Sequence, residues 1–304
     1  MSFPVPQHFT SIESAIHTLF SSDTQIVTTS GVSGGDINDS YKLTLSDGRH
    51  IFMKSNSKGN ASFFTAEAMG LSAIAQTKTI GTPDIICTGT DDGRFDCSFL
   101  LMDFIESKGH IPNYWETFAH QLAEMHKAPT GNFVDGGKYG FVCDNYIGAR
   151  KQINTANESW IAFFRDCRLE PQFKAAAAYF DSADSKKISK LLDHIDNILV
   201  DPGQPSLLHG DLWSGNFITG SDGKAWLIDP AVYVGHAEAD IAMTELFGGF
   251  SQVFYSAYEE TGLLQPEYNS RRDIYNLYHL LNHLNMFGRS YLSSVKRIVD
   301  KYAK

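Results

Sequence analysis

The stretch Leu208-His209-Gly210-Asp211-Leu212-Trp213-Ser214-Gly215-Asn216 is the most informative part of the chain. It is followed by Trp226-Leu227-Ile228-Asp229-Pro230, so an aspartate, an asparagine five residues later and a second aspartate 18 residues after the first occur in that order. Short apolar segments in both parts predict small strands, and the residues between Asn216 and Asp229 predict a hairpin. The three polar side chains are therefore expected in loops beside short strands.

These residue types are the ones that phosphoryl transfer requires. A carboxylate orients the acceptor hydroxyl and takes its proton, while an amide oxygen and a second carboxylate hold the magnesium ions that neutralise a triphosphate. Asp211 is thus the candidate base, and Asn216 and Asp229 are the candidate magnesium ligands. The pattern H-x-D-x-x-x-x-N resembles the catalytic loop of kinases. A turn closed by aspartate side chains, with His209 only packing, is the structural alternative.

Two residues further upstream favour the kinase interpretation. Phe52-Met53-Lys54 is a predicted strand that ends in a lysine, and Glu67 follows 13 residues later in a predicted helix. Kinases use a strand lysine to contact the α- and β-phosphates of ATP, and a helix glutamate holds that lysine in place. Alone, Lys54 could be a solvated charge at a strand end. Four parts in the right chain order favour a kinase-like protein.

Two segments are weaker candidates for contacts with ATP. Gly31-Val32-Ser33-Gly34-Gly35-Asp36 matches neither G-x-G-x-x-G nor G-x-x-x-x-G-K-[ST], but it lies before Lys54. Backbone N–H groups at Gly34 and Gly35 are expected to cap the phosphates, because glycine permits close approach. The segment Met102-Asp103-Phe104-Ile105 is expected to offer backbone groups to adenine. A hairpin turn and an interdomain linker are the respective alternatives.

The whole sequence predicts two lobes. Its 304 residues correspond to about two domains at ~150 residues each. Alternating segments separated by glycine and Asp-Gly turns run from residue 26 to 54 and return between residues 85 and 102, whereas apolar residues recur at helical spacing from Trp115 onward. We therefore expect an α+β protein with a nucleotide-binding, antiparallel-sheet lobe over residues 1–103. Residues 104–304 are expected to form a larger, mainly helical catalytic and substrate lobe.

Composition argues against several classes of protein. The aromatic content of 12% and the mean hydropathy of -0.21 argue against a disordered chain. A formal net charge of -10 disfavours a nucleic-acid partner. No basic segment followed by an apolar run is visible at the start, and the strongest apolar stretch, Cys97 to Ile105, is too short to cross a membrane. The four cysteines stand singly, which suits a cytoplasmic protein.

The most specific marks of the sequence are His209 to Asn216 with a tryptophan at position 213, Asp229-Pro230-Ala231, and Gly235-His236-x-Glu238-Ala239-Asp240. They resemble the fructosamine kinase (ketosamine-3-kinase) family, relatives of the aminoglycoside phosphotransferases within the protein-kinase-like fold. Protein kinases carry Asp-Phe-Gly where this chain has Asp-Pro-Ala. The resemblance runs from about Ser33 to about Tyr291. Further matching segments are Gly34–Asn38, Glu67–Leu71, Leu122–His126, Gly140–Gly148 and Trp160–Leu169.

The resemblance implies an activity. In this family ATP, with Mg²⁺, phosphorylates the 3-hydroxyl of a ketoamine, a sugar attached to an amine by glycation, and the product then releases the amine. The resemblance also implies that His209 and Asp240 support the catalytic loop and that Trp213 faces the sugar. It places Asn282 and His283 near the acceptor, where either could hydrogen-bond sugar hydroxyls. The alternatives are that Trp213 anchors the core and that His283 is a packing histidine.

Other histidines are given structural interpretations. His279 and His283 are four residues apart, a spacing that can bind zinc, but Leu280 stands where H-E-x-x-H requires a glutamate. A metal site there is not expected. His126 is interpreted as structural.

The sequence leaves the identity of the substrate and the oligomeric state undefined. Lys151 and Ala156 stand where relatives often carry proline and tryptophan, which leaves details of the substrate side undefined. One alternative function is another small-molecule kinase of the same fold, acting on an aminoglycoside, choline or homoserine; Trp213 and the Asp-Pro-Ala segment disfavour it. A second alternative is a nucleotide-binding module without catalytic activity. It is disfavoured because the candidate base, magnesium ligands and phosphate-binding pair are all present: Asp211, Asn216, Asp229, Lys54 and Glu67. The sugar, the nature of its amine, free or protein-bound, and the oligomeric state are left open.

Overall fold

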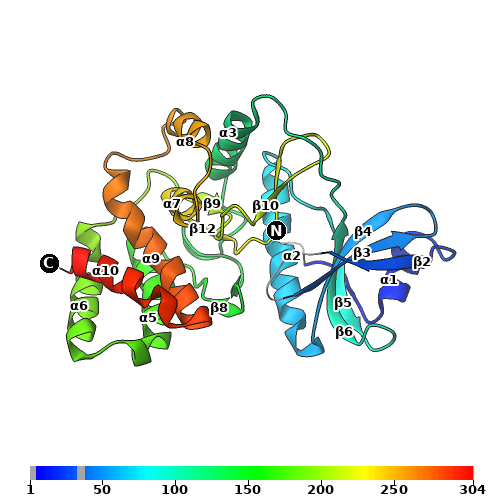
Figure 1. Cartoon of the computed structure of the whole chain (residues 1–304), viewed down its shortest axis with the longest axis horizontal. Coiled ribbons are helices and arrows are strands. Elements are labelled where there is room, and N and C mark those ends of the chain that lie inside the picture. Colours follow the sequence, from blue (N-terminus) through cyan, green and yellow to red (C-terminus); the bar gives the residue numbers. More distant parts are fainter. Residues whose placement is uncertain (1–4, 33–37, 304) are drawn as a thin grey trace. The chain divides into compact units, whose positions relative to one another are not determined.

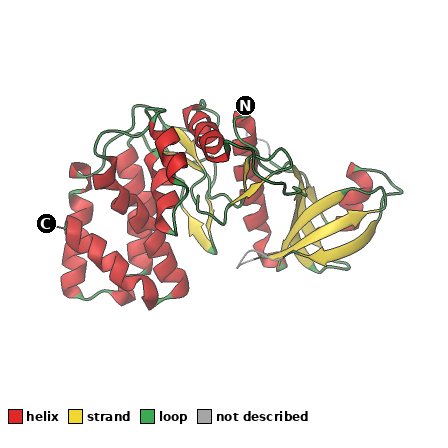
Figure 2. Cartoon of the chain, turned by 45° about the horizontal axis from the view of Figure 1, so that its top comes forward, coloured by secondary structure: helices red, strands yellow, loops and turns green. Residues whose placement is uncertain are grey.

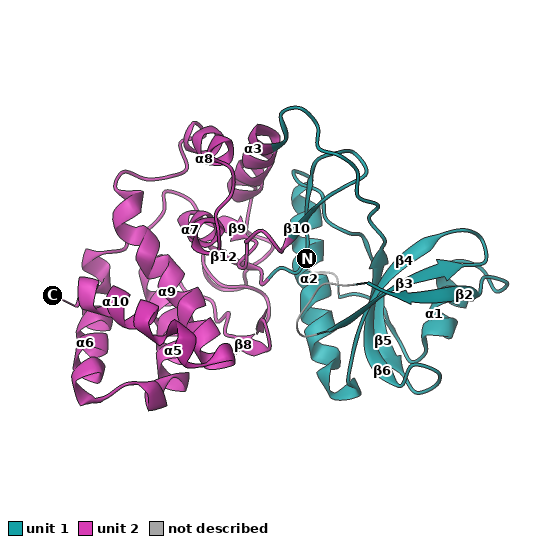
Figure 3. Cartoon of the chain, in the orientation of Figure 1, with its two compact units in different colours: residues 1–114, 217–230 teal, residues 115–216, 231–304 magenta. Residues whose placement is uncertain are grey.

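The computed structural model describes residues 5–32 and 38–303 and divides the chain into two compact units (Figure 3). The first unit comprises Met1–Tyr114 and Phe217–Pro230, and the second comprises Trp115–Asn216 and Ala231–Lys304. Figure 2 shows the largest sheet in the first unit and most of the helices in the second. Within the described ranges, no helix combines the length and the apolar character needed to cross a bilayer.

A six-stranded sheet forms most of the first unit (Figure 1). Its strand order is β1-β5-β6-β4-β3-β2, and all neighbours are antiparallel except β1 and β5. The hairpins predicted between residues 26 and 54 are confirmed, with Gly48 at a φ of 85° in the turn between β3 and β4. The strands are β1 (His8–Phe9), β2 (Ile26–Gly31), β3 (Asp39–Leu45), β4 (His50–Asn56), β5 (Ile85–Asp91) and β6 (Cys97–Asp103).

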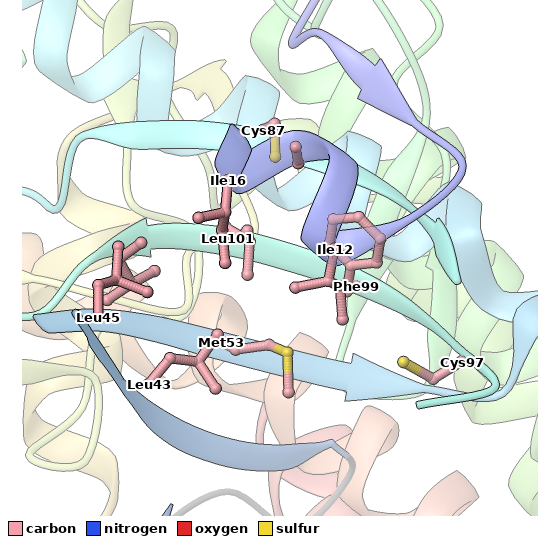
Figure 4. Close-up of a cluster of buried hydrophobic side chains, with 11 residues drawn as sticks. Ile12, Ile16, Leu43, Leu45, Met53, Cys87, Cys97, Phe99 and Leu101 are labelled. Carbon is pink, nitrogen blue, oxygen red and sulfur yellow. The ribbon is translucent and has the colours of Figure 1, made fainter. Parts of the chain in front are cut away.

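Two helices, α1 (Ile12–Leu19) and α2 (Ala61–Thr77), each pack on part of this sheet. Phe99 and Leu101 of β6 pack in a cluster with Ile12 and Ile16 of α1, as Figure 4 shows. Leu100 and Met102 instead pack with Phe64, Ala68 and Leu71 of α2. Because successive side chains of a strand point to opposite faces, β6 is buried on both faces. This explains why Phe99–Met102 forms a continuous apolar run.

The hairpin of β10 (Phe217–Thr219) and β11 (Ala225–Leu227) belongs to the first unit although its flanking residues belong to the second. The backbone N–H of Leu227 donates to the Gly81 carbonyl at 2.8 Å, and the Thr82 hydroxyl donates to the Leu227 carbonyl at 3.0 Å. The N–H of Ile111 donates to the Gly223 carbonyl at 3.1 Å. These bonds join residues 104–114 and the hairpin to the first unit. The compact unit is therefore larger than the lobe expected over residues 1–103, and it is made of two pieces of sequence.

The second unit is mainly helical, as the spacing from Trp115 onward predicts. Two short antiparallel pairs accompany the helices: β7 (Asn145–Ile147) with β8 (Arg150–Gln152), and β9 (Ser206–Leu208) with β12 (Tyr233–Gly235). A π-helical turn, Arg165–Leu169, joins α4 to α5. The helices are α3 (Tyr114–Lys127), α4 (Trp160–Phe164), α5 (Glu170–Ala175), α6 (Ser182–Asp193), α7 (Glu238–Leu246), α8 (Gln252–Glu259), α9 (Tyr268–Phe287) and α10 (Leu292–Tyr302).

Gly81 provides a test of how the hairpin is held. A Cβ at this position would lie 2.6 Å from the Trp226 ring, so Gly81→Ala forces the hairpin away from its hydrogen bonds. We expect the free energy of unfolding to fall by about 1–3 kcal/mol, measured by urea unfolding followed by circular dichroism. Gly131→Ala is the control, because a Cβ there has no neighbour within 4 Å, and it should change stability by less than about 0.5 kcal/mol. Equal stabilities of the two variants would contradict the packing argument.

Candidate active site

A buried lysine of the first unit contacts two carboxylates. Lys54, in β4, is only 7% exposed, and its Nζ donates to Glu67 Oε1 of α2 at 2.5 Å and to Asp229 Oδ1. Met53 packs in the cluster beside α1, so the next side chain of the strand points to the face on which α2 lies. The predicted pairing of Lys54 with Glu67 is therefore present. The contact with Asp229 adds a second carboxylate that the spacing does not predict.

The electrostatics of this triad keep the lysine charged. Burial by itself lowers the pKa of Lys54, but the negative charges of Asp229 and Glu67 outweigh it and raise that pKa above its usual value. Burial raises the pKa of Glu67, and Lys54 opposes this rise. Asp229 is the most exposed member of the triad, with 38% of its side chain exposed.

Asp229 also has an uncommon backbone conformation. Its φ is 54°, in the left-handed region, which aspartate tolerates better than most residues other than glycine. Such conformations persist only where the surroundings impose them, and they are frequent at functional sites. Here the preceding strand β11 is bonded to Gly81 and the side chain is bonded to Lys54. Both ends of the residue are thus fixed.

In the second unit, Asp240 of α7 holds the backbone of the catalytic stretch. Its carboxylate, 1% exposed, accepts hydrogen bonds from the N–H groups of His209 at 2.7 Å and Gly210 at 2.8 Å. His126 Nε2 lies 3.1 Å from the same carboxylate, and His126 Nδ1 lies 2.6 Å from the Tyr258 hydroxyl. Burial alone raises the pKa of Asp240, but the hydrogen bond with His126 and the N–H of Gly210 lower it below its usual value. The carboxylate therefore stays ionised.

Gly210 is required by the loop that Asp240 holds. Its φ is 81°, and a Cβ there would lie 2.1 Å from the Ala231 carbonyl oxygen. The N–H of Ala231 donates to the His209 carbonyl at 2.9 Å, which continues the pairing of β9 with β12. The backbone before Asp211 is therefore fixed on one side by Ala231 and on the other by Asp240.

Asp211 follows directly and contacts three polar side chains. Asn216 Nδ2 donates to the backbone carbonyl of Asp211 at 2.8 Å and to Asp211 Oδ2 at 3.1 Å. The backbone N–H of Asp211 donates to His209 Nδ1 at 3.3 Å. His279 Nδ1 of α9 lies 3.8 Å from Asp211 Oδ1. Burial lowers the pKa of His279 to about 3, so this imidazole is neutral at neutral pH. The sequence does not predict this approach, because helical spacing does not reveal which loop a buried histidine meets.

Two candidate ligand residues are of the types that magnesium accepts. Asn216, in the second unit, carries an amide oxygen and donates its amide nitrogen to Asp211, and Asp229, in the first unit, carries a carboxylate. Magnesium prefers oxygen ligands and usually keeps several water and phosphate ligands, so it needs few protein groups. Over residues 5–32 and 38–303, no group of three or more histidine, cysteine, aspartate or glutamate side chains gathers as a metal cluster.

The three candidate substrate residues differ in how they present their side chains. Trp213 is 37% exposed, and its ring covers Gly215, where a Cβ would lie 2.4 Å from the indole. Phe247 connects it with His283: its ring centroid lies 6.5 Å from Trp213 and 4.7 Å from His283. Asn282 is buried, with its Oδ1 accepting from Gln172 Nε2 at 3.3 Å. Contact of Asn282 with a substrate would have to displace such internal partners. Phe247 was missed, because no motif marks it.

The candidate adenine segment begins inside the sheet. Met102 is a buried core residue paired with β4 and β5, and the N–H of Asp103 donates to the Asp84 carbonyl at 3.0 Å. The chain leaves the sheet after Asp103, where the Phe104 ring lies 4.3 Å from Lys42 Nζ and Ile105 is half-buried. Gly34 and Gly35, the candidate phosphate-capping glycines, lie outside the described residues.

The segment that departs from the family pattern has a buried and an exposed part. Lys151 lies on β8 and forms an exposed ion pair with Asp144 at 2.9 Å. The neighbouring Gln152 is buried, donates to the Ala231 carbonyl at 2.9 Å and accepts from the Tyr278 hydroxyl at 2.7 Å. The replacement of proline by Lys151 is thus accommodated at the surface, while Gln152 contacts the segment that follows Asp229.

The chain is similar in sequence and in fold to known proteins. The sequence matches the family described as fructosamine kinase over residues 8–304. It is 39% identical over 286 residues to the chloroplastic protein-ribulosamine 3-kinase of Arabidopsis thaliana, covering 92% of this chain and 84% of the relative. Its structure resembles that of a Haemophilus somnus protein assigned as a fructosamine-3-kinase, with a TM-score of 0.83, 29% identity and coverage of 96% of both chains.

A more distant likeness concerns the fold alone. A thermostable mutant of an aminoglycoside phosphotransferase, solved in complex with AMP-PNP and hygromycin B, has a TM-score of 0.65 at 14% identity. The likeness covers 97% of this chain and 98% of that one. These similarities confirm the α+β, kinase-like fold expected from the sequence. Because the family match spans nearly the whole chain and the plant relative is well above 30% identical, the chain belongs to the fructosamine kinase family.

Proposed function

We propose that this protein is an ATP-dependent kinase that phosphorylates the 3-hydroxyl of ketoamines, a deglycation activity. The observation that carries the proposal is Asp211, held between the backbone bonds of Asp240 and the side chain of Asn216. The family and the name of the plant relative, a ribulosamine 3-kinase, support the choice of acceptor.

Asp211 acts as the base in this proposal. Its carboxylate accepts the proton of the sugar hydroxyl while the hydroxyl oxygen attacks the γ-phosphorus, and ADP leaves. The hydrogen bond from Asn216 orients the carboxylate, and the bonds to Asp240 fix the backbone that carries it. Asn216 and Asp229 are the residues proposed to hold magnesium, which would neutralise the charge that develops on the phosphates.

The nucleotide is assigned to residues of the first unit. Lys54, protonated and held by Glu67, supplies a positive charge for the α- and β-phosphates. Phosphate oxygens would compete with Asp229 for the hydrogen bond that Lys54 Nζ donates. We propose that the backbone N–H groups of Gly34 and Gly35 cap the phosphates and that residues 102–105 contact adenine. Trp213, His283 and Asn282 are the proposed contacts with the sugar.

A substrate panel tests the activity. Release of ADP is measured with fructosyl-lysine and ribulosyl-lysine and compared with an aminoglycoside, choline and homoserine, and the position of the phosphate is read by NMR. We expect magnesium-dependent turnover of the ketoamines with phosphate on the 3-hydroxyl. Turnover of only one of the other alcohols would replace the proposal with the alternative kinase. Absence of both turnover and magnesium-dependent ATP binding by calorimetry would indicate the silent module.

Asp211→Asn tests the base. The amide keeps the size of the side chain but cannot take a proton, so kcat should fall by about 10²–10⁴-fold while the Kd for ATP stays within about threefold. Single-turnover kinetics and calorimetry measure the two quantities. The control is Asp196→Asn, at an exposed aspartate of the same unit, which should keep wild-type kcat. Unaltered turnover in Asp211→Asn would remove this role.

Lys54→Met tests the phosphate contact. The substitution keeps a long side chain but removes the charge, so we expect kcat/KM for ATP to fall by about 10²-fold or more with little change in KM for the ketoamine. It also leaves Glu67 without its cation, which destabilises the first unit. Glu67→Gln is therefore measured in parallel, since it keeps Lys54 and weakens only its positioning. Wild-type kcat/KM for ATP in both variants would contradict the assignment.

A further inference from the structure

Two exposed aromatic side chains of the second unit are joined by a row of ring contacts. Trp213 and Phe287 are 37% and 51% exposed, two of the few large apolar side chains exposed in the described part of the chain. Between them the ring centroids are 6.5 Å apart for Trp213 and Phe247, 4.7 Å for Phe247 and His283, and 5.2 Å for His283 and Phe287. Tyr291 closes the row at 5.0 Å from His283. We call these five residues the aromatic row.

The local structure explains how the row forms. His283 and Phe287 are four residues apart on α9 and so share one face of the helix. Gly288, at a φ of 87°, ends the helix and redirects the chain, which brings Tyr291 to 6.4 Å from Phe287. Phe287 contributes little to the core, because half of its surface stays in water.

His283 gives an independent observation at the centre of the row. Its Nδ1 is buried and has no hydrogen-bond partner, which is uncommon for a buried polar atom in a folded protein. Burial also lowers the pKa of His283, so the ring is neutral at neutral pH. A neutral imidazole among three aromatic rings adds no positive charge to the row. Such a surface does not repel a cationic ligand.

We propose that the aromatic row is the subsite for the amine substituent of the ketoamine, and that Phe287 determines how well apolar substituents bind. This inference rests on the proposed function, because Trp213 is two residues from Asp211 and faces the sugar in that proposal. The row leads from Trp213 through Phe247 and His283 to Phe287 and Tyr291, two rings to which the proposed sugar contacts assign no role. A ketoamine carries a secondary amine that is protonated near neutral pH, and aromatic faces attract such cations. Its apolar substituent would pack on Phe247, Phe287 and Tyr291.

Two ketoamines with the same sugar test the subsite, one made from methylamine and one from benzylamine. Phe287→Ala should raise KM for the benzylamine compound about tenfold and leave KM for the methylamine compound within about twofold. The kcat values and the KM for ATP should not change, because the ring contacts of Phe287 are with His283 and Tyr291 rather than with Asp211. Phe287→Trp should restore the preference for the benzylamine compound.

The control is Val253→Ala. Val253 is 44% exposed on α8 of the same unit but is not part of the aromatic row, so its removal should not alter the ratio of the two KM values. Equal changes of KM for both compounds in Phe287→Ala, or no change for either, would overturn the subsite while leaving the proposed function intact. If the wild-type protein phosphorylates neither ketoamine, the proposed function fails and the subsite fails with it.

Discussion

The carboxylate of Asp240 is the group on which the arrangement around Asp211 depends. It is buried and ionised, and it binds two consecutive backbone N–H groups and one histidine. A buried anion is costly unless its hydrogen bonds are satisfied, so helix α7, the loop and His126 of α3 must be placed together. The left-handed Gly210 and its close approach to Ala231 follow from the same constraint. The position of Asp211 is therefore determined by buried groups on α3 and α7 and by the backbone of Ala231.

Local sequence patterns predict the parts of the site that depend on one element or on neighbouring elements. The strand lysine and helix glutamate were foreseen because strand alternation and helix position determine which faces meet, and the hairpins because glycine turns mark them. Three features were out of reach: the bond from Lys54 to Asp229, 175 residues apart, the approach of His279 to Asp211, and the place of Phe247. Each depends on packing between distant segments, which neither spacing nor composition encodes.

The two groups of polar residues also differ in how they bear charge. Lys54 lies with the carboxylates of Glu67 and Asp229, and Asp229 is the most exposed of the three side chains. Asp211 has a different environment, in which Asn216, His209 and the neutral imidazole of His279 are neighbouring polar side chains. The first arrangement pairs a cation with two carboxylates, whereas the second surrounds a carboxylate with an amide and imidazole rings.

The hairpin of β10 and β11 has a consequence for how this protein can be divided. Because residues 217–230 pair with Gly81 and Thr82, the first unit is made from two separate pieces of sequence. A fragment that stops at residue 114 lacks strands that the rest of that unit bonds to, and one that begins at residue 115 carries a hairpin without its partner. Chimaeras between relatives would therefore have to exchange both pieces together.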